Sequence, residues 1–291
     1  MYPLVSVIIP VWNDQDKIKL CLDALKKQSI GNSKLEVIVV DNASTDNTAK
    51  VLEDFDWIQV LYEPTPGSYV ARNTALKVAK GKYLAFTDSD CVPDSNWLEK
   101  CLICAEQQPD FGVIAGEVRF FQPIGKSVEQ SADDYETLFS MNQKINSKNG
   151  VSITANFFSK NSVVQKYGGF NSNLKSGGDH ELSKKISDDG KPIVFCKEAF
   201  VLHPSRNIKE LLVKRRRVIG GSWDRQLVNG STVNFFWLAT KLFIKRTILA
   251  TINQKLDLHR KCALVSLLLK IFIVSCSEII RLKKGGDSVR S

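Results

Sequence analysis

Two acidic residues, Asp88 and Asp90, flank one serine in Thr87-Asp88-Ser89-Asp90, directly after a short apolar run. Hard divalent cations are usually held by one or two carboxylates together with the phosphates of a substrate. A reaction in which a diphosphate departs needs its developing negative charge neutralised, and a bound metal supplies that charge. The pair therefore indicates a site for Mg²⁺ or Mn²⁺. The competing interpretation is an ordinary turn or a helix cap, because Asp is common in both.

Another carboxylate, Asp41, opens the polar segment Asp41-Asn42-Ala43-Ser44-Thr45-Asp46, again after an apolar run. Ser44, Thr45 or Asp46 is suited to cap the helix expected next, which leaves Asp41 without that explanation. A carboxylate at the end of a parallel strand can hydrogen-bond the base or ribose of a nucleotide. Asp41 is therefore a candidate nucleotide-binding residue.

A further carboxylate, Asp179, stands before a helical pattern that carries Leu182 and Ile186. A carboxylate that takes a proton from an attacking hydroxyl accelerates a reaction by roughly 10²–10⁴-fold. The alternative is that Asp179 caps that helix, and Glu181 is a second candidate for the base. His203, taken alone, is more typical of a buried structural histidine than of a metal ligand.

The elements expected to position these residues alternate between strand and helix. Apolar β-branched runs predict strands at Val5–Ile9, Leu35–Val40, Ile58–Tyr62 and Tyr83–Thr87. Helical spacing between them predicts helices at Lys17–Lys27, Thr48–Phe55 and Val70–Lys80. This alternation predicts an α/β fold with a mostly parallel sheet flanked by helices. Ligands of such sheets bind beyond the carboxyl ends of the strands. Three polar segments fall there: Pro10-Val11-Trp12-Asn13, Asp41-Asn42-Ala43-Ser44 and Asp88-Ser89-Asp90.

The pattern is looser after Cys91. It predicts a helix at Trp97–Gln107, strands at Val113–Phe121 and Ser152–Ser159, a helix at Asp179–Ser187, short strands at Ile193–Cys196 and Ala199–His203, and only helices from Ile208. We expect residues 1–230 to form the catalytic α/β domain and residues 231–291 to form a basic, apolar-rich helical region.

Four motifs occur in a recognisable order: VSVIIPVWND, VIVVDNASTD, PGSYVARN and YLAFTDSD. Together they resemble the nucleotide-binding half of family 2 glycosyltransferases with the GT-A fold. The resemblance continues through ANFFSKNSVVQKYGGFN and SGGDHELSKKI, and covers roughly residues 4–230. It implies an inverting transfer of a sugar from a nucleotide-diphosphate sugar to an acceptor hydroxyl, in the synthesis of cell-surface polysaccharide or glycolipid.

The resemblance also implies roles for individual residues. The implied nucleotide-sugar-binding residues are Pro10, Trp12, Asp41, Arg72, Asn73 and Asp88. Asp90 would hold the metal that bridges the diphosphate, His203 would add a ligand, and Asp179 would be the general base. Family members often carry Glu-Asp where this chain has Gly178-Asp179. The Gln-x-x-Arg-Trp pattern of the family's processive synthases is missing, which favours addition of one sugar per event.

The charge of the chain is unevenly distributed. The net charge is +9, which divides into −4 for residues 1–204 and +13 for residues 205–291. Two apolar runs, Phe235–Ile252 and Cys262–Ile280, lie in the basic part, and Lys270 interrupts the second. A Lys inside a membrane span costs about 2.5–3.5 kcal/mol. We therefore expect helices that lie on an anionic membrane surface, near a lipid-linked acceptor, and the alternative is a helical subdomain packed on the core or at a dimer contact.

Several other classes of protein are disfavoured by the sequence. No GxGxxG follows the first strand, which argues against a dinucleotide oxidoreductase, and Trp12-Asn13-Asp14 does not resemble the glycine-rich loop of a nucleotidyltransferase. Nucleic acid is not an expected partner. A non-catalytic sugar-nucleotide-binding or membrane-scaffold protein of the same fold remains the alternative. The absence of a secretory signal and the irregular cysteine spacing predict a cytoplasmic location, at the cytoplasmic face of the membrane.

Overall fold

The computed structural model describes residues 3–123, 125–226 and 231–288. Contacts divide the chain into two compact units. The α/β unit comprises Met1–Arg119, Met141–Asn173 and Gly178–His203, and the helical unit comprises Phe120–Ser140, Leu174–Gly177 and Pro204–Ser291. These units group residues by their contacts, and residues 204–226 pack with the later helices. The predicted domain boundary near residue 230 stays a prediction.

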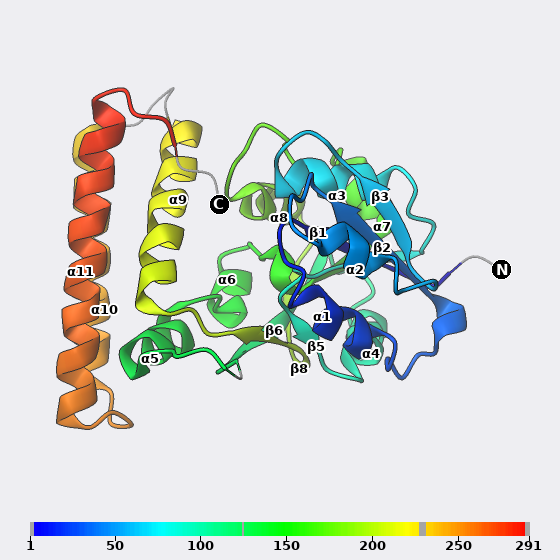
Figure 1. The fold of residues 1–291 in the computed structure, drawn as a ribbon, viewed down its shortest axis with the longest axis horizontal. Coiled ribbons are helices and arrows are strands. Elements are labelled where there is room, and N and C mark those ends of the chain that lie inside the picture. The colour runs from blue at the N-terminus through cyan, green and yellow to red at the C-terminus, as the bar shows by residue number, and fades with distance from the viewer. Residues whose placement is uncertain (1–2, 124, 227–230, 289–291) are drawn as a thin grey trace. The chain divides into compact units, whose positions relative to one another are not determined.

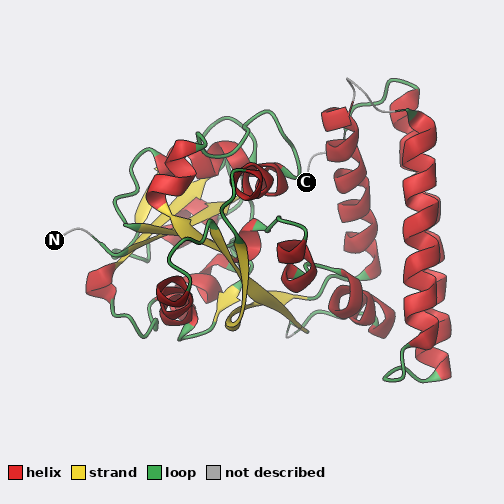
Figure 2. Ribbon diagram, turned by 180° about the vertical axis from the view of Figure 1, so that it is seen from behind, coloured by secondary structure: helices red, strands yellow, loops and turns green. Residues whose placement is uncertain are grey.

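The sheet has eight strands in the order β3-β2-β1-β4-β7-β6-β8-β5. Its first half is parallel, as predicted, and consists of β1 (Val5–Val11), β2 (Leu35–Asp41), β3 (Gln59–Tyr62) and β4 (Tyr83–Phe86). The other half is formed by β5 (Val92–Pro93), β6 (Val113–Phe121), β7 (Phe157–Lys160) and β8 (Ile193–Pro204). In this half β7 runs antiparallel to β4 and to β6, and β5 runs antiparallel to β8. Figure 2 shows the strands as one twisted sheet among helices.

Helices of the α/β unit lie around this sheet (Figure 1). They are α1 (Ile18–Leu25), α2 (Thr48–Leu52), α3 (Ser68–Leu76), α4 (Trp97–Gln107), α6 (Gln143–Lys148), α7 (Asn161–Lys166) and α8 (Gly178–Asp188). Ile18, Leu22 and Leu25 are buried, as the helical spacing predicts. The strand predicted at Ser152–Ser159 begins only at Phe157, because Thr154–Asn156 form a 3₁₀ turn. The two short strands predicted before residue 204 are one continuous strand, β8.

The core of the α/β unit is dominated by residues of the central strands. Val5, Val7, Ile8 and Ile9 of β1 are fully buried. A strand flanked by two others and covered on both faces buries its successive side chains alike, which explains the uninterrupted apolar run. Free cysteines Cys101 and Cys104 lie one turn apart on α4, and the first of them is buried in this core.

The helical unit contains α5 (Gln130–Phe139), α9 (Ile208–Gln226), α10 (Thr232–Ile252) and α11 (Leu258–Lys283). Helix α11 packs against α5, α9 and α10, and Figure 1 shows α9, α10 and α11 side by side. The side chains of Ser231 and Asp257 accept hydrogen bonds from the first turns of α10 and α11 and so begin both helices.

Candidate active site

The register of the parallel strands brings three polar segments to one edge of the sheet. Val11 pairs with Asp41, Asp41 with Tyr62, and Ile8 with Phe86. The residues that follow Val11, Asp41 and Phe86 therefore emerge at the same edge, as the sequence predicted. Pro10 lies in β1 beyond Ile8, the last residue that pairs with β4. The N–H that proline lacks is therefore not needed for the hydrogen bonds between β1 and β4.

The loops after β1 and β2 lock each other in place. The Asn13 side chain accepts a hydrogen bond from the Thr45 N–H (2.7 Å), and the Asn13 N–H donates to Ser44 Oγ (3.0 Å). Asp41, only 5% exposed, accepts the Ser44 N–H at 3.0 Å through Oδ1. Trp12 is 44% exposed at this edge. One carboxylate oxygen of Asp41 is thus committed to shaping the loop.

Asn42 holds the segment that leads into α3. Its Nδ2 donates to the carbonyls of Glu63 and Thr65, and its Oδ1 accepts the Gly67 N–H at 2.7 Å. Gly67 has φ +146°, a conformation that side-chain-bearing residues rarely adopt. This role of Asn42 was not predicted from the sequence. Its position directly after Asp41, at the end of a predicted strand, is the feature that could have indicated it.

Arg72 and Asp88 form the central ion pair of this edge. An Arg72 guanidinium nitrogen, Nη2, lies 2.6 Å from Asp88 Oδ1, and Arg72 is only 3% exposed. Arg72 Nη1 donates to the Ser68 carbonyl, whereas its buried Nε meets no acceptor among the residues that the structure describes. The structure thus joins two predicted site residues that come from different motifs.

Ser89, between the two aspartates, ties them to the end of β1. Its hydroxyl donates to Asp14 Oδ2 at 2.6 Å, and Lys17 Nζ lies 2.8 Å from the other oxygen of Asp14. Asp14 was not predicted as part of the site. This contact fixes the backbone between Asp88 and Asp90.

The residues around Asp90 suit a divalent metal. Ligand atoms of Asp88, Asp90 and Cys91 all lie within 4.8 Å of one another. His203 Nε2, on a side chain that is 1% exposed, lies 3.6 Å from Asp90 Oδ2. Burial, followed by the charges of Asp90 and Asp88, raises the pKa of the Cys91 thiol well above its usual range, and hard divalent cations prefer oxygen ligands to a thiol. The fitting donors are therefore carboxylate oxygens and an imidazole nitrogen, which suit Mg²⁺ or Mn²⁺.

Asn73 faces a different neighbour. Its Nδ2 donates to the Phe170 carbonyl (2.6 Å) and to Ser172 Oγ (2.9 Å), and its Oδ1 accepts the Phe170 N–H. Asn73 thus joins α3 to the turn after α7. Its predicted contribution to a nucleotide pocket stays a prediction, and the contacts observed for its amide are structural.

Asp179 accepts hydrogen bonds from two segments that are distant in sequence. Its Oδ1 accepts a hydrogen bond from the Tyr69 hydroxyl (3.1 Å), and its Oδ2 accepts the Thr154 N–H (3.3 Å). The N–H that it accepts from its own helix is that of its neighbour His180. A side chain that caps a helix binds the N–H two or three residues on, so these contacts differ from capping.

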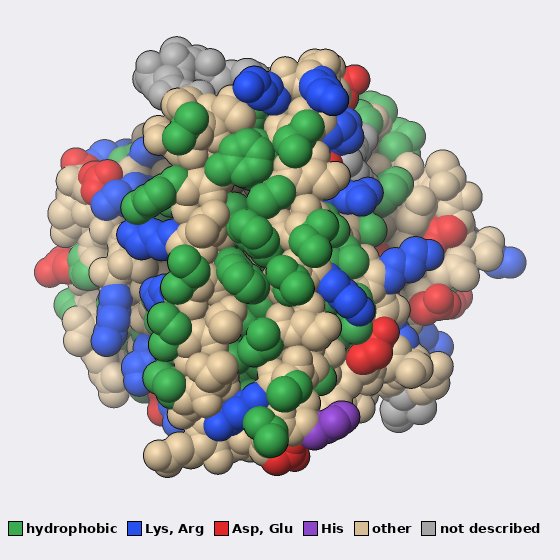
Figure 3. Space-filling model, turned by 90° about the vertical axis from the view of Figure 1, so that its left-hand side faces the viewer, with side chains coloured by type: hydrophobic (Ala, Val, Ile, Leu, Met, Phe, Trp, Pro, Cys, Tyr) green, Lys and Arg blue, Asp and Glu red, His purple; other side chains and the backbone are tan. Residues whose placement is uncertain are grey.

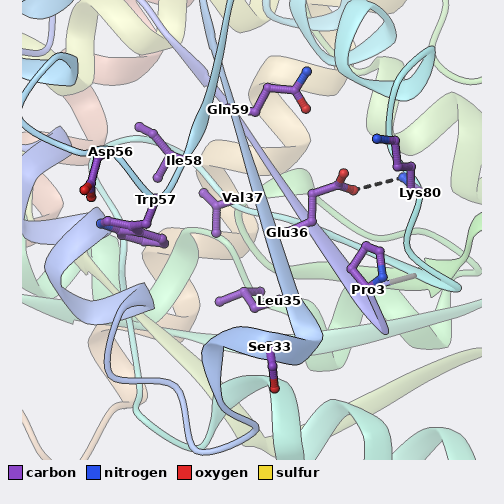
Figure 4. A pocket seen from close by; sticks show the side chains of 10 residues that line it. All are labelled: Pro3, Ser33, Leu35, Glu36, Val37, Asp56, Trp57, Ile58, Gln59 and Lys80. Atoms are coloured by element: carbon purple, nitrogen blue, oxygen red, sulfur yellow. Dashed lines mark hydrogen bonds between the residues drawn. The ribbon is translucent and has the colours of Figure 1, made fainter. Parts of the chain in front are cut away.

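A pocket of about 610 Å³ lies elsewhere in the α/β unit (Figure 4). Its lining includes Leu35 and Gln59, the first residues of β2 and β3, and Trp57. It therefore lies at the amino ends of these strands, away from the predicted site residues.

Residues 6–168, more than half of the chain, match the model of "Glycosyl transferase family 2". The chain belongs to glycosyltransferase family 2. It is 38% identical over 221 residues to Glycosyltransferase AglE of Haloferax volcanii, a match that covers 74% of this chain and 72% of that protein. It is 39% identical over 92 residues to the poly(ribitol-phosphate) beta-glucosyltransferase of Bacillus spizizenii, covering 30% of this chain and 14% of that protein.

The predicted GT-A fold of this family 2 glycosyltransferase is confirmed by solved structures. One is the mannosyltransferase PcManGT from Pyrobaculum calidifontis in complex with GDP-Man and Mn²⁺, with a TM-score of 0.61 and 20% identity over 99% of this chain and 77% of that one. Another is S. aureus TarS 1-349 in complex with UDP, with a TM-score of 0.55 and 21% identity over 97% of this chain and 91% of that one. At these identities the likeness concerns the fold.

Proposed function

We propose that this family 2 glycosyltransferase transfers one sugar per event, with inversion, from a nucleoside-diphosphate sugar to an acceptor hydroxyl. The observation that carries the proposal is that one helix, α3, contacts two separate carboxylates of the site. Arg72 pairs with Asp88, and Tyr69, three residues earlier, donates to Asp179. The same short element thus connects the group proposed to hold the donor with the group proposed to deprotonate the acceptor.

The donor is proposed to bind at the carboxyl edge of β1, β2 and β4. Trp12 is exposed there and offers an aromatic face, while Asp41 keeps one carboxylate oxygen beyond its loop contact. Arg72 brings a buried guanidinium to the same edge. The complexes of the structural neighbours with UDP and with GDP-Man support a nucleotide or nucleotide sugar as the ligand.

A divalent cation, Mg²⁺ or Mn²⁺, is proposed as the cofactor. Asp90 would hold it, with Asp88 and His203 as neighbouring donors. When bound, such an ion neutralises the charge of a departing diphosphate. The Mn²⁺ in the complex of the mannosyltransferase neighbour supports this assignment.

Asp179 is proposed to act as the general base. The acceptor oxygen forms a bond to the anomeric carbon while the bond from that carbon to the diphosphate oxygen breaks. The acceptor proton moves to the Asp179 carboxylate, and the electron pair of the broken bond leaves with the nucleoside diphosphate. Attack from the face opposite the leaving group inverts the anomeric centre, and no second carboxylate is needed as a nucleophile.

The test is a screen of the purified protein with UDP-glucose, UDP-N-acetylglucosamine and GDP-mannose, each with Mn²⁺ or Mg²⁺. Release of the nucleoside diphosphate from one of these donors, abolished by chelator, would support the proposal. NMR of the product reports the anomeric configuration, and retention would refute the single-base mechanism.

The helical unit is proposed to bind the cytoplasmic face of an anionic membrane and to serve a lipid-linked acceptor. Figure 3 shows hydrophobic side chains gathered on one face, with Lys and Arg along its margins. Large apolar side chains of α10 that are exposed recur at helical spacing: Val233, Trp237, Ile244, Ile248 and Ile252. Helix α11 is long and apolar enough to cross a membrane, with a mean hydropathy of 2.2 in its most apolar window, of which 39% is buried.

Surface binding combines two contributions. Burial of the exposed apolar side chains resists salt, whereas each Lys or Arg near an anionic leaflet adds about 1 kcal/mol that salt screens. The full chain should therefore float with anionic vesicles and be released only in part by salt. If it stays monodisperse without lipid or detergent and does not float, the apolar face is covered by an oligomer contact instead.

A further inference from the structure

Tyr69 occupies an enclosed position between two segments of the α/β unit. It is 6% exposed, and its ring stacks on Phe170 with a centroid distance of 5.6 Å. Its hydroxyl donates to Asp179 Oδ1 at 3.1 Å, a contact between residues 110 positions apart in the chain. The ring packing sets the position of the hydroxyl, because a tyrosine ring with both faces enclosed has little rotational freedom.

Gly178, directly before Asp179, provides the space for this ring. A Cβ at residue 178 would lie 3.0 Å from Cδ2 and Cε2 of Tyr69 and 3.1 Å from its Cζ. Gly178 does not adopt a positive φ, in contrast to Gly177 at +80°. The backbone at residue 178 therefore does not require glycine, and the Tyr69 ring is the feature that excludes a side chain.

The Tyr69 hydroxyl keeps its proton and can only donate to the carboxylate. Burial, followed by the negative charge of Asp179, raises the pKa of Tyr69 above its usual range, and the nearby Arg72 opposes this only in part. A neutral hydroxyl that faces a carboxylate forms a charge-assisted hydrogen bond, which is about twice as strong as a neutral one.

We propose that Tyr69 is a positioning residue for Asp179, and that Gly178 is glycine because the Tyr69 ring must reach that carboxylate. Tyr69 and the His180 N–H both donate to Oδ1, and the Thr154 N–H donates to Oδ2, so both oxygens are fixed in direction and Oδ2 keeps a lone pair that can receive the proton. This carboxylate is thereby pre-aligned for proton transfer. The inference rests on the proposed function, since it assigns Tyr69 a task only if Asp179 is the base.

Tyr69→Phe tests the hydroxyl and keeps the ring that packs on Phe170. With the nucleotide sugar that supports turnover in the screen above, we expect kcat to fall about tenfold, as for the loss of one hydrogen bond to a charged group. KM for the donor should stay unchanged, and the melting temperature should fall by no more than the few degrees that one lost hydrogen bond costs. A loss confined to kcat distinguishes a positioning role from a role in donor binding, which would raise KM. Tyr83→Phe is the matched control, since Tyr83 also stacks on a phenylalanine, Phe158, and has no role in the site.

Gly178→Ala tests whether the Tyr69 ring needs the space that glycine leaves at residue 178. Alone it should lower kcat, because the ring must shift and the hydroxyl moves with it. In a Tyr69→Ala background the same substitution should cost little more, so the two effects should be strongly non-additive. Additive losses would overturn the assignment of Gly178.

Asp179→Asn separates this inference from the proposed function. If it abolishes turnover while Tyr69→Phe retains the wild-type kcat, Tyr69 is not a positioning residue and the base assignment stands. If Asp179→Asn retains turnover, the assignment of Asp179 as the base fails, and the inference fails with it. A fall in kcat for Tyr69→Phe that is accompanied by a drop in melting temperature well beyond that of Asp179→Asn would show a structural role and overturn the inference.

Discussion

Replacing Asp179 by asparagine distinguishes a catalytic carboxylate from a structural one. The carboxylate accepts from two donors outside its helix, the Tyr69 hydroxyl at Oδ1 and the Thr154 N–H at Oδ2. An asparagine has one acceptor oxygen, so whichever way its amide is oriented, its NH₂ group faces one of these donors. The variant therefore loses one hydrogen bond and keeps the shape of the side chain.

The two interpretations predict different magnitudes. A lost hydrogen bond of this kind costs about 0.5–1.5 kcal/mol, or roughly 2–4 °C in melting temperature per kcal/mol for a domain of this size. A purely structural Asp179 would thus show this loss of stability with turnover retained. A general base predicts the same modest loss of stability with kcat lowered at least about a hundredfold.

The assay combines thermal unfolding, donor binding and single-turnover kinetics on one preparation. We expect a small decrease in melting temperature, unchanged donor affinity and loss of turnover. Glu181→Gln is the control for a neighbouring carboxylate, since Glu181 instead contacts Lys185 and Asn171. Retained turnover in Asp179→Asn together with loss in Glu181→Gln would move the base to Glu181 and refute the reasoning.

Three other predictions follow from the site. Asp90→Ala should abolish transfer and remove the dependence of donor binding on Mn²⁺, as measured by calorimetry; full activity of the variant, or of the wild type in excess chelator, would contradict the metal assignment. Arg72→Ala should destabilise the fold by about 3 kcal/mol in denaturant unfolding, because it leaves the half-buried Asp88 without its cation. This is the lower end for a broken buried ion pair, since solvent also contacts that carboxylate. Iodoacetamide at pH 8 should modify the exposed Cys262 and spare Cys91, whose thiol stays neutral because burial and adjacent carboxylates raise its pKa; rapid modification of Cys91 in folded protein would contradict this.

Much of the fold followed from local patterns. Short apolar runs spaced by helical segments were enough to predict the first four strands. For β1, β2 and β4 the reason is that strands covered on both faces select β-branched and aliphatic side chains at successive positions. The edge strand β3, whose Val60 and Tyr62 are exposed, has the β-branched and aromatic residues typical of strands. Helix α5 was not predicted, because its sequence is polar and its acidic residues form ion pairs only in the tertiary structure. Asp134 pairs with Arg260, and Glu136 pairs with Arg206. No local spacing indicates these partners.

The sequence alone determined that Asp41, Asp88 and Asp90 come to one edge, because parallel strands end side by side and the residue after each strand must emerge there. Which side chains then meet was decided by the tertiary structure. The Arg72 pairing with Asp88, the amide of Asn73 turned toward Phe170, and the Tyr69 hydroxyl on Asp179 join segments 16, 97 and 110 residues apart. The spacing of residues along the chain determines the direction in which a side chain leaves its own strand or helix. The group that the side chain contacts depends on how separate elements pack, and this packing is set by the volumes and contacts of the whole core.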